Sequence, residues 1–115
     1  MAQSYAFVGI DTSSLITHWS EGAEQLFGYR RSDVMGRDLA IIIPERHREA
    51  HRAGFRAAME SPTISDVHLD VPTVHLSGSE REYPVRLMVL MDAFGTALGA
   101  LAVFSSSGTV GIPLY

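Results

Sequence analysis

The sequence predicts an α+β domain in which one five-stranded antiparallel sheet carries helices on one face. Apolar residues alternate with a period of two at residues 5–19 and 67–104, and they follow a helical period between these segments. Strands grouped at both ends around a helical middle are typical of a single antiparallel sheet with segregated helices. The length of 115 residues suits one domain. We place this domain at residues 5–104, with an aperiodic tail, expected to be a loop, at residues 105–115.

The N-terminal half of the domain is predicted to form a hairpin followed by short helices. Residues 5–10 and 15–19 have the composition of strands and are separated by an Asp-Thr-Ser-Ser turn. Ser20 can cap the next helix, and Gly28 suits the left-handed position that ends it. The apolar run at residues 39–43 is too short to form an independent helix.

A longer helix is predicted at residues 44–61. Pro44 suits its first position, and a Ser-Pro pair ends it. On a helical wheel, His47 and Phe55 lie within about 40° of His51, whereas most of the charged residues lie on the opposite side. His51 is therefore expected at the centre of the stripe that faces the sheet.

Three further strands are predicted as a meander at residues 67–74, 82–91 and 98–104. The middle strand has apolar residues on both faces, and Met88 and Leu90 lie on the face opposite the core. Because a solvated sheet face should be polar, we expect this outer face to be covered. The sequence therefore predicts a homodimer through the outer face, centred on Met88 and Leu90.

Composition and charge exclude several classes of function. Hydrophobic residues make up 46% and charged residues 19%, which is typical of a globular protein. The absence of cysteine excludes disulfides, thiolate metal sites and cysteine catalysis. A net charge of −4 disfavours nucleic-acid binding, and no apolar run is long enough to span a membrane. Because no signal peptide is evident, we expect a cytoplasmic protein without nucleic-acid or membrane partners.

Four segments resemble the signature sequences of PAS sensor domains. They are residues 16–29, 32–37, 43–51 and 82–85. The first resembles the pattern I-x-x-W-N-x-x-A-E-x-L-F-G-Y, and the third resembles the I-P-E-x-x-R-x-x-H start of the long PAS helix. The segments have the order and spacing of the family across residues 5–104. This resemblance implies a PAS-like fold and a sensory module of signal transduction, with a small-molecule cavity between sheet and helices and a separate signalling partner.

His51 carries the cofactor hypothesis. In the heme-binding gas sensors that this segment resembles, the heme-iron ligand is a histidine seven residues after the proline, and Pro44 and His51 have that spacing. The resemblance implies heme b as a candidate cofactor with His51 as the metal ligand, and a neutral imidazole on an apolar face suits this role. Without heme, the ligand is undefined and His51 is a partly buried structural residue. The predicted cofactor-binding residues are His51, Phe55, Leu69, Val71 and Leu87.

The sequence departs from the oxygen-sensing members of that subgroup on the strand after the helix. Val71 stands where those sensors have an arginine, and Leu69 stands where a related sensor has a methionine. An apolar wall cannot stabilise the partial charge of bound oxygen. With heme bound, we therefore expect sensing of CO or NO, or His68 as a sixth iron ligand.

The sensor hypothesis has one main alternative. The alternative is a ligand-free module that acts by dimerisation. We do not predict an enzyme, because the His47 and His51 pair lacks the glutamate position of a zincin and no nucleotide-binding glycine motif is present. A flavin photosensor is disfavoured because such sensors form their adduct on a cysteine, and the chain has none.

Overall fold

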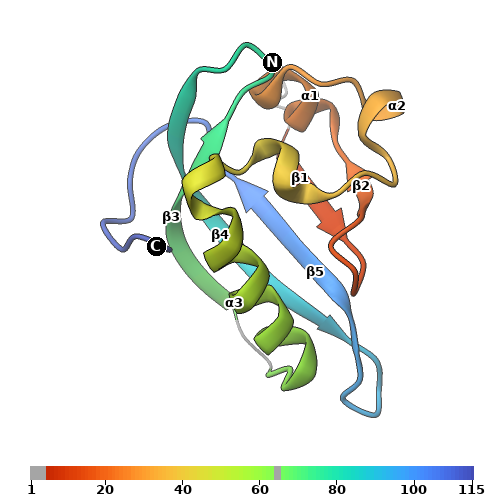
Figure 1. The fold of residues 1–115 in the computed structure, drawn as a ribbon. Coiled ribbons are helices and arrows are strands. Elements are labelled where there is room, and N and C mark those ends of the chain that lie inside the picture. The colour runs from red at the N-terminus through yellow and green to blue at the C-terminus, as the bar shows by residue number, and fades with distance from the viewer. Residues whose placement is uncertain (1–4, 64–65) are drawn as a thin grey trace.

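The structure, a computed structural model, describes residues 5–63 and 66–115. Within these residues the chain forms one five-stranded antiparallel sheet with the strand order β2-β1-β5-β4-β3, and helices cover one of its faces (Figure 1). The predicted fold class is confirmed. The strands are β1 (Ala6–Ile10), β2 (Ile16–Trp19), β3 (Asp66–Val74), β4 (Glu80–Met91) and β5 (Ala97–Phe104).

The helical middle of the chain begins and ends as capping chemistry predicts. Ser20 Oγ accepts a hydrogen bond from the Ala23 N–H at 3.1 Å, and Gly28 ends the first helix with a φ of +82°. The long helix starts later than predicted, because Pro44 itself is extended and one 3-10 turn precedes the α-helix. The helices are α1 (Glu21–Phe27), α2 (Arg31–Val34), η1 (Leu39–Ile42), η2 (Glu45–His47) and α3 (Arg48–Glu60).

The hydrophobic core is centred on Phe27 at the end of α1. This side chain is fully buried and lies between three aromatic rings: Trp19 at 5.5 Å, Phe104 at 5.0 Å and Tyr83 at 6.3 Å between centroids. The edge-to-face arrangement with Phe104 and Tyr83 is the geometry that aromatic quadrupoles favour. The core thus joins α1 to strands from both halves of the sheet.

The packing beneath α3 is looser than the packing around α1. The helix lies over β5 (Figure 1), yet none of its residues is buried. The inner face of β5 presents only small side chains here, those of Ala100 and Ala102, and both remain half-buried. Several larger side chains on the same sheet face are also half-buried rather than buried: Leu69, Leu87, Val89 and Met91. The contact between α3 and the sheet is therefore made by half-buried side chains rather than by fully buried ones.

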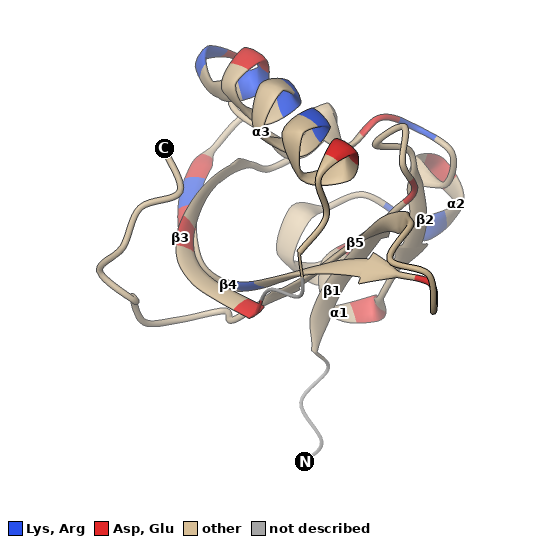
Figure 2. Cartoon of the chain, turned by 90° about the horizontal axis from the view of Figure 1, so that it is seen from below, with Lys and Arg blue, Asp and Glu red and all other residues tan. Residues whose placement is uncertain are grey.

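Residues 105–115 contain no helix or strand, but they are fixed against the sheet. The tail follows the free edge of β3 and ends near α3 (Figures 1 and 2). A parallel bridge joins Pro113 to Asp70, with the Asp70 N–H donating to the Ile112 carbonyl at 2.8 Å and the Leu114 N–H donating to the Asp70 carbonyl at 3.0 Å. Leu114 packs against the core. The tail therefore shields an edge that would otherwise expose unpaired backbone groups.

Candidate ligand-binding site

His51 lies in the second turn of α3, on the side that faces the sheet. Its neighbour one turn later, Phe55, is also half-buried, and the two rings stack with centroids 6.1 Å apart and planes inclined by 15°. The spacing of four residues brings these side chains onto one face of the helix. The inward stripe predicted from the helical period is therefore present, with an imidazole and a phenyl ring as its main members.

The His51 imidazole has an unusual polar environment. Its Nε2 atom is buried and has no hydrogen-bond partner among the described residues. Burial lowers the pKa of His51 below its ordinary value; the nearby charge of Asp38 opposes this effect and that of Arg52 adds to it. The ring is therefore neutral at physiological pH, and a nitrogen lone pair is available if the proton resides on Nδ1.

The sheet supplies the wall opposite α3. The β3–β4 register pairs Leu69 with Val85 and Val71 with Tyr83, and Leu87 lies two residues beyond Val85 on the same face. Val71 belongs to the buried core, and Leu69 and Leu87 pack against it. The predicted cofactor residues of the sheet thus share the face that α3 covers. Their contact with a ligand stays a prediction.

His47 has a different role from His51. It precedes α3 and stacks on Tyr115 of the tail, with ring centroids 4.5 Å apart and planes inclined by 7°. No group of three or more metal-ligating side chains occurs within residues 5–63 and 66–115. The two histidines therefore have separate roles, since His47 contacts the tail and His51 faces the sheet.

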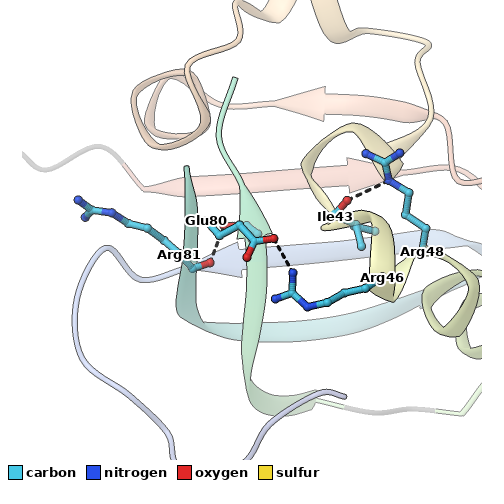
Figure 3. Close-up of polar contacts among 6 residues, drawn as sticks. Ile43, Arg46, Arg48, Glu80 and Arg81 are labelled. Atoms are coloured by element: carbon cyan, nitrogen blue, oxygen red, sulfur yellow. Dashed lines mark hydrogen bonds and ion pairs between the residues drawn. The ribbon is translucent and has the colours of Figure 1, made fainter. Parts of the chain in front are cut away.

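The arginines next to His47 fix the start of α3. Arg46 forms an ion pair of 2.6 Å with Glu80 at the beginning of β4, and Arg48 Nε donates to the Ile43 carbonyl at 3.0 Å (Figure 3). The Arg81 side chain points away from this group (Figure 3). These contacts connect the N-terminal end of α3 to the sheet and to the segment before it, and so position His51 one turn later.

The expectation that His68 supplies a sixth iron ligand is wrong. His68 is exposed and pairs with Arg86 across β3 and β4. Its Nε2 atom lies 3.5 Å from Oδ1 of Asp66 on the outer face. Because side chains alternate along a strand, His68 must point away from the face that carries Leu69. An imidazole on the outer face cannot reach a ligand beneath α3.

Two features of the site region were not predicted from the sequence. Ser14 is buried, has a φ of +65°, and its Oγ lacks a hydrogen-bond partner among the described residues. Asp70 is buried and accepts hydrogen bonds from the tail, which the sequence predicted only as a loop. A run of polar turn residues was the only sequence signal for Ser14, and no local signal marked Asp70.

Together, the single antiparallel sheet and the helices on one of its faces define an α+β domain, with the buried Nε2 atom of His51 on the side of α3 that faces the sheet. A family model described as the PAS fold matches residues 4–106. The chain belongs to the PAS family, whose members are sensory domains of signal transduction. No helix in the described part of the chain has the length and apolar character needed to cross a membrane.

Solved structures share this fold. The PAS domain of a protein from Colwellia psychrerythraea has 19% identity and a TM-score of 0.76, covering 88% of this chain and 84% of that one. An RNA-binding light-oxygen-voltage receptor has 16% identity and a TM-score of 0.73, covering 88% of this chain but 29% of the receptor. A light-oxygen-voltage domain studied with a flavin analogue has 25% identity and a TM-score of 0.69, with coverages of 92% and 78%.

Proposed function

We propose that this chain is a non-catalytic sensory module that holds a small apolar or planar ligand between α3 and the inner face of the sheet. The observation that carries the proposal is the buried Nε2 of His51, which has no hydrogen-bond partner among the described residues. A buried polar atom without a partner costs about 1–3 kcal/mol. A ligand atom or metal ion bound to Nε2 would remove this cost, and binding would shift the packing of α3 against the sheet.

The shape of the interior supports the same proposal. The face of α3 that carries His51 and Phe55 is half-buried, and so is the opposing sheet surface. Ala100 and Ala102 present only methyl groups on the strand that the helix crosses. A flat ligand inserted there would bury apolar surface on both sides, which favours binding by roughly 25 cal/mol per Å².

Heme b is the cofactor that the residues of this region fit best. A neutral imidazole with a free Nε2 is the usual proximal ligand of heme iron, and His51 would hold it. When bound, heme would supply an iron atom able to take a diatomic gas. Leu69 and Val71 offer no hydrogen-bond donor from their side chains to bound oxygen. We therefore infer CO or NO, rather than oxygen, as the signal.

A flavin is the other cofactor to consider, because a structural neighbour was studied with a flavin analogue. The flavin ring carries N–H and C=O groups along one edge, and these need polar partners. This sequence has no asparagine, and its glutamines are Gln3 and Gln25. Gln25 lies on α1, whereas the sheet positions near α3 include Leu87, Ala100 and Ala102. The residues therefore favour heme over flavin.

Titration of the purified protein with hemin tests this proposal. We expect uptake of one hemin per chain with a Soret band, which His51→Ala abolishes. His47→Ala is the matched control, because His47 contacts the tail, and it should retain the band. A parallel titration with FMN should show no binding. Absence of stoichiometric hemin uptake, or an unchanged band in His51→Ala, would contradict the heme assignment.

A second function, dimerisation through the outer sheet face, is favoured by a separate observation. Phe7 and Leu90 are 37% and 43% exposed, and the β-ladder places them on the same face as Met88, Leu101 and Val103. Apolar side chains from three adjacent strands thus form one outer surface. Exposed apolar patches of this kind mark interaction sites in many proteins. We infer that a second copy of the chain covers this surface.

Light scattering tests the dimer. Leu90→Glu and Met88→Glu place charges within the proposed interface and should convert a dimer to a monomer. Phe94→Glu is the control, because Phe94 is 93% exposed in the turn between β4 and β5 and should not affect assembly. A monomeric wild-type protein at high concentration would contradict the proposal.

A further inference from the structure

A groove separates the β1–β2 turn from the C-terminal half of α3. Its volume is about 410 Å³, which is within the range of small-molecule sites. Of the five predicted cofactor residues, Phe55 alone borders it, so the groove lies on a different flank of α3 from the proposed heme site. The lining residues are Thr12, Ser13, Ser14, Asp38, Arg52, Phe55, Arg56, Met59 and Glu60.

Ser14 has two unfavourable features at this groove. It is the only non-glycine residue with a positive φ in the described part of the chain, and its φ is +65°. Its side chain is also buried, with an Oγ that has no hydrogen-bond partner within the described residues. Strained residues and unsatisfied buried groups are both concentrated at functional sites. A glycine at this position would avoid both the strained backbone and the unsatisfied hydroxyl. We therefore interpret the Ser14 hydroxyl as a group that binds a ligand.

The backbone around Ser14 cannot easily relax. The Ser14 N–H donates to the Asp11 carbonyl at 3.1 Å, and the Ser14 carbonyl accepts from the Leu39 N–H at 3.0 Å. The Asp11 carboxylate holds the same turn by accepting from the N–H groups of Ser13 and Leu15. The turn therefore holds the Ser14 backbone in one conformation beside the groove.

The chemistry of the groove indicates which ligand it would take. Arg52 and Arg56 lie one turn apart on α3, and guanidinium groups bind carboxylates through paired hydrogen bonds. Phe55 and Met59, also one turn apart, supply an apolar surface. The groove also contains two carboxylates, so its formal charge is zero. A dianion such as phosphate is therefore disfavoured relative to a singly charged group.

We propose that this groove binds a small monocarboxylic acid with an apolar body. The Ser14 hydroxyl and the guanidinium groups of Arg52 and Arg56 donate hydrogen bonds to the carboxylate. The apolar body of the ligand packs on Phe55 and Met59. This site is independent of His51 as a cofactor ligand, because its polar contacts come from other residues.

An NMR titration of the isotopically labelled protein with sodium phenylacetate tests the proposal. We expect saturable shifts of the amides at the β1–β2 turn and in the second half of α3 at ligand concentrations up to about 10 mM. Phenylacetamide, a neutral analogue of the same shape, should bind about tenfold more weakly because it lacks the charged acceptor. Inorganic phosphate at equal ionic strength should not produce the same shifts.

The decisive variant is Ser14→Gly. Glycine accepts a positive φ without strain, so this variant should fold at least as stably as the wild type while its affinity for phenylacetate falls about tenfold. Arg56→Gln should weaken binding by a similar factor, and Arg81→Gln, on β4, should leave it unchanged. Equal affinity of Ser14→Gly and wild type would overturn the proposal. So would equal binding of phenylacetamide or a lack of saturable shifts, and none of these outcomes bears on hemin uptake.

Discussion

The hydroxyl of Thr109 donates a hydrogen bond of 2.8 Å to the carboxylate of Asp70, although the two residues are separated by 39 positions. The same carboxylate accepts from the N–H groups of Val110 and Gly111, each at 2.7 Å. The Val110 N–H, followed by the Thr109 hydroxyl and the Gly111 N–H, holds the pKa of Asp70 below its ordinary range, against the opposing effect of burial. One ionised carboxylate therefore fixes the tail to β3.

Asp70→Asn should loosen the tail. The amide presents a donor where the carboxylate accepts, so one N–H or O–H of the tail loses its partner. We expect the Leu114 amide, which donates to the Asp70 carbonyl, to exchange its hydrogen about tenfold faster or more. Asp92→Asn is the control, because the Asp92 carboxylate holds the β4–β5 turn and should affect that turn only. Unchanged Leu114 exchange in Asp70→Asn would contradict this account of the tail.

The stability of the protein should decrease at mildly acidic pH because of His51. Burial lowers the pKa of the folded imidazole, so the unfolded chain binds a proton at a higher pH than the folded chain does. The contribution of His51 to the free energy of unfolding is fully present above the pKa of the imidazole in the unfolded chain, about 6.5. It is lost as the pH falls through the lower pKa of the imidazole in the folded chain. Thermal unfolding between roughly pH 7.5 and pH 5 measures the effect. His51→Leu should reduce the decrease in Tm, and a decrease in His51→Leu equal to that of the wild type would contradict the assignment.

Phe27 should be the most costly core residue to truncate. It is fully buried among Trp19, Tyr83 and Phe104, so removal of its ring leaves a cavity that the surrounding side chains cannot fill. We expect Phe27→Ala to lower the free energy of unfolding by about 3–5 kcal/mol in chemical denaturation. The exposed Phe94 is the matched control, and Phe94→Ala should change the free energy of unfolding by less than about 0.5 kcal/mol. A loss below about 1 kcal/mol for Phe27→Ala would show that the core is centred elsewhere.

Two helical glycines should respond in opposite directions to alanine. A Cβ at Gly22 in α1 would lie 2.3 Å from the Tyr5 carbonyl oxygen, so Gly22→Ala should destabilise the contact between α1 and β1. A Cβ at Gly54 in α3 meets no atom within 4 Å, so Gly54→Ala should raise the free energy of unfolding by up to about 1 kcal/mol through helix propensity. Denaturation of both variants measures the contrast. A stabilised Gly22→Ala or a strongly destabilised Gly54→Ala would be inconsistent with the packing of these helices.

The sequence predicts those features that depend on local periodicity. Alternation placed Leu69 and Leu87 on the covered face, and the helical period placed His51 on the inward side of α3. The same alternation places His68 on the opposite face, so the hypothesis that His68 is a sixth iron ligand was inconsistent with the strand pattern. The position of Asp70 was beyond prediction, because its burial depends on backbone groups some 40 residues later in a segment without any period. The conformation of Ser14 could not be predicted either, since it is set by contacts with Asp11 and Leu39 rather than by its own residue type.

The central claim is that the buried Nε2 of His51 is the group that binds the cofactor. Hemin titration of His51→Gly, with and without added imidazole, tests it most directly by absorption spectroscopy. Removal of the side chain leaves a space in which free imidazole can occupy the position of the ring. We predict that His51→Gly shows no Soret band of the wild-type form and that imidazole restores this band. Wild-type hemin binding by His51→Gly without imidazole would contradict the claim, as would a wild-type protein that takes up no hemin.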